Sequence, residues 1–203
     1  MQFCETQTYL NLARSFAGES QAGMRYQLIA REATAQGYIA LADEIKTLAK
    51  NETVHARRFF EELTKRGGEA IDNIDIDAGY PFHTGDLVEM LHLAAVDKRA
   101  EHETIYPAFA KTARDEGFAD IAGLFTMIAT VEKHHEQIFN YLHEAMESGN
   151  LYKNESPILY ICKECGHKQT LKEAWDVCPL CKSSQGFVAL HVPYEKNSDL
   201  PSL

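Results

Sequence analysis

The chain has 203 residues, of which 45% are hydrophobic and 25% charged, and its formal net charge is −10. This composition is typical of a globular protein, and the acidic excess argues against a nucleic-acid partner because phosphate backbones bind basic surfaces. No apolar run approaches the roughly 20 residues that cross a bilayer, and the start, MQFCETQTYLNLARSF, lacks the features of a secretion signal. We therefore expect a cytoplasmic protein with no membrane partner.

Four long segments with helical periodicity fill the first part of the chain, at residues 6–35, 38–65, 84–114 and 118–147. Short connections at Gly37 and Gly117 predict two antiparallel helical hairpins. The middle connection, residues 66–83, is long enough to cross the length of a bundle. The sequence thus predicts a mainly α protein built on a ferritin-like four-helix bundle with one long crossover.

The first segment carries one carboxylate on its apolar stripe, Glu19, and Tyr26 follows two turns later. The second segment places two polar residues, Glu52 and His55, on the stripe that should face the core. A buried glutamate without a partner costs several kcal/mol or more, so these side chains require compensation.

The third segment has Lys98 and Glu101 on its stripe, and the fourth repeats the pattern of the second with Glu132 and His135. One Glu-x-x-His match is often a satisfied core pair, but two at matching depth favour a shared site. One Glu from each of two helices with Glu-x-x-His from the other two is a pattern that binds two metal ions between helices.

Composition changes near residue 150, and four cysteines follow within twenty residues. We expect a bundle domain at 1–148, a linker at 149–157, a small domain at 158–192 and a tail at 193–203 that carries no interpretable signal. The two Cys-x-x-Cys pairs predict one metal held by Cys162, Cys165, Cys178 and Cys181. Four thiolates suit both iron and zinc, and a zinc ribbon is the commoner outcome of such spacing. Cys4 lies far from these pairs.

These motifs resemble the rubrerythrin family, which joins a ferritin-like di-iron domain to a rubredoxin-like domain. The resemblance extends over about residues 8–190 and is carried by FAGESQAGMRY at 16–26, NETVHARRF at 51–59, EHETIYPAFAKTARDEGF at 101–118 and VEKHHEQIF at 131–139. It implies two irons in the bundle, and it favours iron over zinc in the four-cysteine site.

The resemblance also implies roles for individual side chains. Glu52 and Glu132 would bridge the two irons, with His55 and His135 as terminal nitrogen ligands. Glu19 would be a terminal carboxylate, and Glu101 would match a carboxylate that trades places with a histidine as the iron moves on reduction. Tyr26 and Tyr106 match tyrosines that are hydrogen-bonded near the metals.

One position departs from the family pattern. The family places a further ligating glutamate where this chain has Lys98, and a protonated lysine cannot ligate a metal. Asp97 replaces that ligand if the helix bulges locally; otherwise the second iron keeps an open or water-filled position and binds more weakly.

The activity implied by the resemblance is reduction of hydrogen peroxide to water in oxidative-stress defence. Electrons would pass from an NAD(P)H-dependent reductase, often through a separate rubredoxin, and the chain would form a homodimer or larger homo-oligomer. Two alternatives remain: a ferroxidase or oxidase that uses oxygen, and a binding or scaffold protein whose four-cysteine site is a zinc ribbon.

Overall fold

We analysed a computed structural model of the chain, which describes residues 2–67 and 73–192. The predicted tail at 193–203 lies outside the described residues. Within the described ranges, no helix is both long enough and apolar enough to span a membrane.

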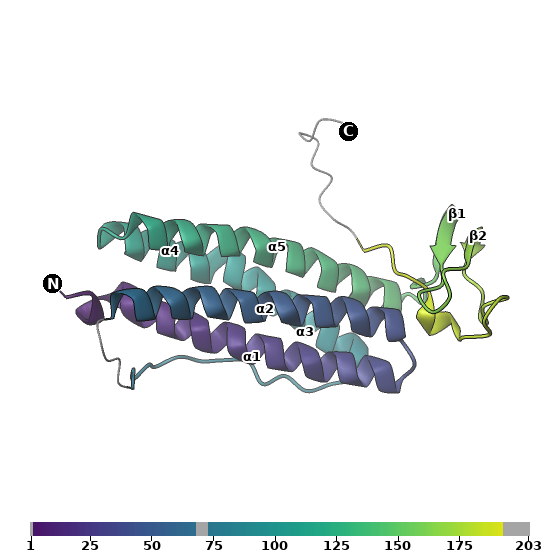
Figure 1. Cartoon of the computed structure of the whole chain (residues 1–203), viewed down its shortest axis with the longest axis horizontal. Coiled ribbons are helices and arrows are strands. Elements are labelled where there is room, and N and C mark those ends of the chain that lie inside the picture. The colour runs from purple at the N-terminus through teal and green to yellow at the C-terminus, as the bar shows by residue number, and fades with distance from the viewer. Residues whose placement is uncertain (1, 68–72, 193–203) are drawn as a thin grey trace, which may run out of the picture.

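Four long helical stretches form the bundle (Figure 1). They are α1 (Gln7–Ala35), α2 (Ile39–Arg66), α3 (Leu87–Ala100) with α4 (Tyr106–Asp115), and α5 (Ala119–Glu147); a 3₁₀ turn, η1 (Phe3–Glu5), precedes them. α1 packs on α2, and both α3 and α4 pack on α5. This arrangement confirms the two predicted hairpins, and the connection between them runs beside α1 (Figure 1).

Both hairpins turn in the same way. Gly37 and Gly117 each have φ +87°, the left-handed conformation that glycine adopts without strain. The residue after each glycine donates a backbone hydrogen bond to the last turn of the preceding helix, Tyr38 to Ala33 and Phe118 to Ala113. These bonds satisfy carbonyls that the helix end would otherwise leave unpaired.

The third predicted helix is not a single α-helix. A π-helical turn, η2 (Glu101–Ile105), joins α3 to α4, and the Tyr106 amide donates to the carbonyl of Glu101. A π-turn inserts one extra residue and often lies at a functional site. The local bulge considered for Asp97 therefore exists, but it lies after Lys98 rather than before it.

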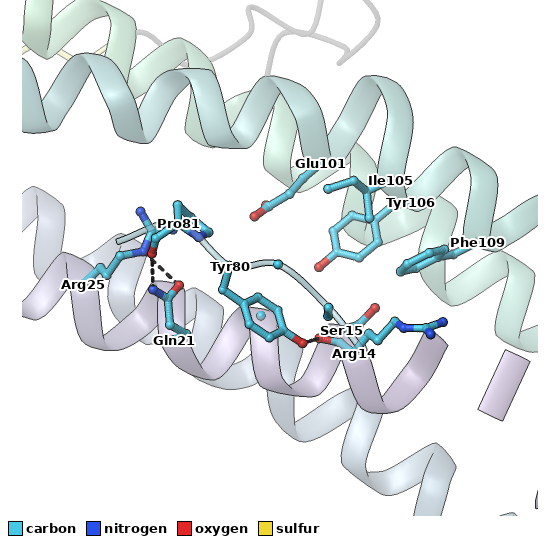
Figure 2. Close-up of a pocket in the computed structure, with 13 residues that line it drawn as sticks. Arg14, Ser15, Gln21, Arg25, Tyr80, Pro81, Glu101, Ile105, Tyr106 and Phe109 are labelled. Carbon is cyan, nitrogen blue, oxygen red and sulfur yellow. Dashed lines mark hydrogen bonds between the residues drawn. The ribbon is translucent and has the colours of Figure 1, made fainter. Parts of the chain in front are cut away.

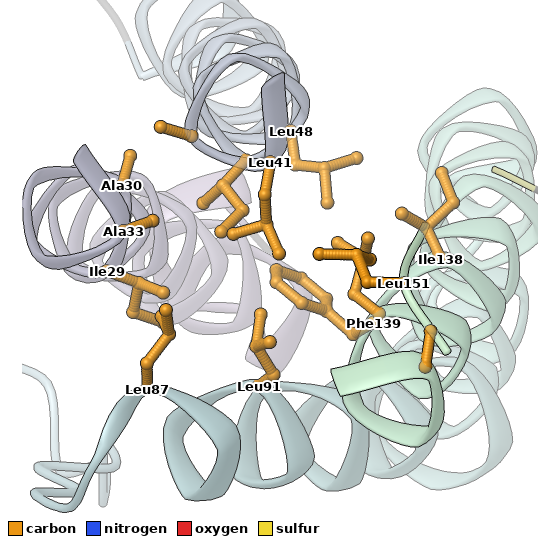
Figure 3. Close-up of a cluster of buried hydrophobic side chains, with 14 of the residues drawn as sticks. Ile29, Ala30, Ala33, Leu41, Leu48, Leu87, Leu91, Ile138, Phe139 and Leu151 are labelled. Atoms are coloured by element: carbon orange, nitrogen blue, oxygen red, sulfur yellow. The ribbon is translucent and has the colours of Figure 1, made fainter. Parts of the chain in front are cut away.

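Two hydrophobic clusters fill the bundle, one toward each end. The cluster nearer the C-terminal part of the chain includes Leu41, Leu91 and Phe139, whose side chains converge between the helices in Figure 3. The other cluster includes Phe59 and Phe125. The polar seam residues lie between these clusters, so apolar packing closes the site at both ends.

The C-terminal part contains a two-stranded antiparallel sheet, β1 (Lys153–Ile161) with β2 (Lys168–Glu173), and a 3₁₀ turn, η3 (Gln185–Phe187). β1 begins inside the segment predicted as a linker. Leu151 and Tyr152 are buried in the same cluster as Phe139, so the chain passes directly from the bundle into the small domain. The polar composition of residues 149–157 did not indicate that Leu151 and Tyr152 would be buried.

Gly186 holds the small domain against the turn between α1 and α2. A Cβ atom at this position would overlap the backbone carbonyl of Gly37, which is not the end of a flexible side chain. We predict that Gly186→Ala lowers the free energy of unfolding by about 1–3 kcal/mol, because the backbones must separate. Urea denaturation would measure this. Gly123→Ala, whose Cβ meets nothing within 4 Å, is the control, and equal stability of the two variants would contradict the prediction.

Candidate metal centres

The predicted seam residues meet between the two hydrophobic clusters. α1 contributes Glu19, α2 contributes Glu52 and His55, and α5 contributes Glu132, all four buried. Each of these four residues offers one ligand atom, and the four atoms lie within 4.8 Å of one another. The structure therefore brings together a group of the size that holds a metal ion.

The first half of the site is built around His55. Its Nδ1 atom lies 2.8 Å from a carboxylate oxygen of Glu132 and 3.6 Å from oxygens of Glu19 and Glu52. All of these oxygens belong to side chains with at most 1% exposure. Three carboxylates and one imidazole are the ligand types that suit iron.

The second half of the site is built around His135. Its Nδ1 atom lies 2.9 Å from Glu52 and 2.9 Å from Glu132, and its ring centroid is 5.8 Å from that of His55. Glu52 and Glu132 therefore contact both histidines, which is the position required of bridging carboxylates. The Asn51 amide lies 3.3 Å from His135 Nε2 and orients the ring.

Lys98 completes the second half in place of a carboxylate. Its ammonium lies 2.6 Å from Glu101, 2.9 Å from Glu132 and 3.2 Å from Glu52, and its side chain is 0% exposed. The lysine is thus a member of the site, with its charge directed at the same carboxylates as the histidines.

Asp97 lies elsewhere. Its carboxylate pairs with Arg25 at 2.8 Å and with His83 at 3.1 Å. The structure gives no support to Asp97 as the replacement ligand, because its position on the helix directs it toward the crossover connection while Lys98 takes the inward position.

Burial and mutual repulsion set the protonation of the carboxylates. Burial, together with Glu132 and Glu52, raises the pKa of Glu19 well above its usual value. Burial also raises the pKa of Glu52, but Lys98 and hydrogen-bonded neighbours outweigh it and hold the pKa well below its usual range. Burial raises the pKa of Glu101 to about 7 even though Lys98 opposes the shift.

Burial acts on the pKa of the two histidines in the opposite direction, because it disfavours their protonated form. Burial lowers the pKa of His55, but its contacts with Glu132 and the other carboxylates raise it to about 12. The same opposition raises the pKa of His135 to about 9. Protons on the two imidazoles, with the Lys98 ammonium, supply the positive charge that the carboxylates need when no metal is bound.

Buried side-chain atoms that lack a hydrogen-bond partner test whether the site suits a metal ion. Although ionic contacts reach them, four buried atoms have no hydrogen-bond partner among the described residues: Glu19 Oε2, Glu52 Oε1, His55 Nδ1 and Glu132 Oε1. Buried polar atoms are normally satisfied, and these four belong to the 4.8 Å group. Metal ions would satisfy them, so this Glu/His site suits a di-iron centre.

The two tyrosines differ. The Tyr106 hydroxyl donates to Glu19, whereas the Tyr26 hydroxyl has no hydrogen-bond partner among the described residues. The Tyr26 ring instead lies with its centroid 5.5 Å from the ammonium of Lys98. Both tyrosines are buried beside the metal group, but only Tyr106 has the expected hydrogen bond.

We predict that Tyr106→Phe weakens metal binding in the bundle about 10- to 100-fold, because it removes the donor that orients Glu19. Anaerobic titration with ferrous ion would measure the affinity. Tyr26→Phe is the matched control, since it removes a hydroxyl that holds no ligand. An equal loss in both variants would show that ring packing, rather than the hydrogen bond to Glu19, supports the site.

The four cysteines also converge. The Sγ atoms of Cys162 and Cys181 are 3.7 Å apart, as are those of Cys165 and Cys178. A tetrahedron of thiolates about 2.3 Å from a central ion has edges of about 3.8 Å, so the cluster has the right size. It suits a rubredoxin-like iron site.

Two similar turns build this cluster. Gly166 and Lys182 each follow a Cys-x-x-Cys pair with positive φ, 76° and 67°. The amide of each donates to the carbonyl of the first cysteine of its pair, Cys162 or Cys178. The Ser183 hydroxyl lies 3.1 Å from Cys181 Sγ and lowers the pKa of that thiol to about 6.

Sequence reasoning identified the ligand types and the departure at Lys98, but it missed two supporting residues. Lys98 was expected at a ligand position, and the structure places its ammonium among the carboxylates. Asn51 and Ser183 carry no motif and are recognised only by their contacts with His135 and Cys181. The one sequence feature that could have pointed to Asn51 is its position immediately before Glu52.

Comparison with known proteins agrees with the two metal sites described above. A family model described as Rubrerythrin matches residues 11–143 and 93–163. The chain is 37% identical over 185 residues to Rubrerythrin-1 of Clostridium acetobutylicum, covering 90% of this chain and 93% of the relative.

Two solved structures share the fold. A mixed-valence state of nigerythrin matches with a TM-score of 0.61 at 19% identity, over 94% of this chain and 92% of that one. A bacterioferritin of Desulfovibrio desulfuricans, described by its di-iron site, matches with a TM-score of 0.62 at 22% identity, over 71% and 82% of the two chains. The predicted ferritin-like bundle with a C-terminal four-cysteine cluster is confirmed.

Proposed function

The chain belongs to the rubrerythrin family, and from this premise we propose that it reduces hydrogen peroxide to water with electrons relayed through the four-cysteine iron. The observation that carries the proposal is the presence of both sites in one chain. An iron in four thiolates transfers one electron at a time, and a di-iron centre supplies the two electrons that break an oxygen–oxygen bond. Peroxide takes up two electrons and two protons to give two water molecules.

A cavity of about 260 Å³ supports access of a small substrate to the bundle site. Figure 2 shows α1 on one side of this cavity and Glu101, Ile105 and Tyr106 on the other, with Tyr80 crossing between them. The Tyr80 hydroxyl donates to the backbone carbonyl of Arg14, which fixes the crossover connection over α1. In this proposal peroxide enters beside Glu101.

The site residues hold protons close to where the substrate would react. Burial raises the pKa of Tyr106 well above its usual value, and that of Glu101 to about 7. Both groups line the cavity. We assign to them the delivery of protons to the departing oxygen atoms.

The two sites of one chain are far apart. Glu52 lies about 20 Å along the helix axis from Ile39, where α2 begins, and the four-cysteine domain lies beyond that end of the bundle (Figure 1). We therefore propose a head-to-tail homodimer or larger assembly, in which the four-cysteine iron of one copy faces the bundle site of another. A rubredoxin or an NAD(P)H-dependent reductase would supply electrons, in a reducing cytoplasm that keeps the thiols free for metal.

Rapid mixing tests the reaction. The full iron-loaded chain would be reduced anaerobically and mixed with hydrogen peroxide or with oxygen, while the thiolate-to-iron absorption is followed. Faster return of this absorption with peroxide supports the proposal. Faster return with oxygen would favour the oxidase alternative, and zinc in the four-cysteine site would favour the scaffold alternative.

A further inference from the structure

Lys98 is a feature of the bundle site that a symmetrical pair of metal positions does not explain. Its side chain is completely buried, and its ammonium contacts Glu52, Glu101 and Glu132 at 2.6–3.2 Å. Two of these carboxylates, Glu52 and Glu132, also face both histidines. A fixed positive charge thus lies against the carboxylates of one half of the site.

Comparison of the two halves of the bundle shows which residue of the first half corresponds to Lys98. Tyr26 follows Glu19 by seven residues in α1, and Tyr106 follows Lys98 by eight residues on the other side of the site. The π-turn of η2 accounts for the one extra residue. Lys98 therefore occupies the place in its half that Glu19 occupies in the other.

The tyrosines confirm this correspondence, because each reaches across to the opposite half. Tyr106 donates to the carboxylate of Glu19. The Tyr26 ring centroid lies 5.5 Å from the Lys98 ammonium, which cannot accept a hydrogen bond, and the Tyr26 hydroxyl has no partner among the described residues. A carboxylate at position 98 could accept the hydrogen bond that the Tyr26 hydroxyl lacks among the described residues.

We propose that Lys98 makes the two metal positions unequal, with its ammonium standing in for the second ion. One divalent ion binds at the Glu19–His55 position, where the four ligand atoms already lie within 4.8 Å. A second ion, beside His135, binds only when it displaces the ammonium from Glu52 and Glu132. The buried ammonium already pairs with these two carboxylates, and breaking a buried ion pair is costly. The second ion therefore binds at least about 100-fold more weakly than the first.

Manganese(II) is a suitable probe because it prefers carboxylate and imidazole ligands to thiolates. The full chain, with one equivalent of zinc in the four-cysteine site, would be titrated with Mn²⁺ and followed by electron paramagnetic resonance. The wild type is expected to take up one tightly bound Mn²⁺ with the spectrum of an isolated ion. A spin-coupled pair should form only at a concentration at least about 100-fold higher.

Two substitutions sharpen the test. Lys98→Met keeps the length of the side chain without its charge, and Lys98→Glu restores a carboxylate. Either variant should form the spin-coupled pair at low Mn²⁺ concentration. Lys111→Met, at a 74% exposed lysine in α4, is the control and should behave as the wild type.

The wild-type titration decides the inference even if a variant fails to fold. Coupled pairs in the wild type from the first additions of Mn²⁺ would overturn the inference and leave the peroxidase proposal intact. No bundle-bound Mn²⁺ at all would overturn both, since both rest on a metal site between the helices.

Discussion

Replacement of Glu132 by Gln is expected to empty the bundle site and to lower kcat/KM for hydrogen peroxide by about 1000-fold or more. Glu132 lies 2.8 Å from His55 and 2.9 Å from both His135 and Lys98, so it touches both metal positions. A neutral amide cannot bridge two ions or balance their charge. Elemental analysis and steady-state peroxide assays would measure the two effects, and the four-cysteine site should keep its iron.

Glu136→Gln is the control for this prediction. Glu136 lies one turn further along α5 and pairs with Arg99 and His102, outside the metal group. Its replacement should leave iron content and peroxide turnover close to those of the wild type. If Glu132→Gln retained a full complement of bundle iron, Glu132 would not be a bridging ligand.

The second large effect concerns Cys181. Cys181→Ser should remove iron from the four-cysteine site and lower reductase-driven peroxide turnover about 100-fold or more, because the relay loses its one-electron carrier. The bundle site should still react with peroxide after chemical reduction. Absorption spectra and the two assays would separate these outcomes. Cys4→Ser, at an exposed residue outside the cluster, is the control.

Mixing the two inactive variants tests the assembly. Glu132→Gln keeps a working four-cysteine site, and Cys181→Ser keeps a working bundle site. If electrons pass between copies, exchange of subunits should restore part of the reductase-driven turnover. No recovery in a mixture shown to contain mixed dimers would indicate that electrons pass within one chain.

Much of the site could be predicted because buried charge leaves a clear mark on a periodic sequence. Glu52, His55, Glu132 and His135 interrupt apolar stripes at the same depth, and few arrangements other than metal binding make such burial tolerable. The two cysteines of each Cys-x-x-Cys pair are spaced so closely that one local turn brings their thiols together, and the fold of the small domain then joins the two pairs. In both cases the ligand types are visible locally, and the fold adds the meeting of the helices or of the two cysteine pairs.

The role of Lys98 could not be predicted in the same way. A sequence shows that a lysine stands on the seam, but whether its ammonium turns away or enters a carboxylate cluster depends on packing in three dimensions. Asp97 was a reasonable substitute on charge alone, yet Arg25 and His83 lie close enough to bind it. The π-turn at Glu101–Ile105 has no pattern of its own and becomes visible only from backbone hydrogen bonds.

The small domain shows a further limit of composition. Polar residues after position 148 resemble a linker, but Leu151 and Tyr152 bury themselves in the bundle core. Gly186 gives no indication in the sequence that it contacts Gly37, because the contact joins residues far apart in the chain. Long-range contacts of this kind decide how the two parts meet.

The correspondence between the two hairpins has a consequence for how such a site evolves. A bundle assembled from two identical copies of one hairpin would carry the same side chain at both equivalent positions, so any mutation would change both metal positions at once. Here the crossover connection joins both hairpins in a single polypeptide, and each half accumulates substitutions independently. Glu19 and Lys98 illustrate that freedom: corresponding places in the two halves hold a carboxylate and an ammonium, so the two ion positions differ in their chemistry.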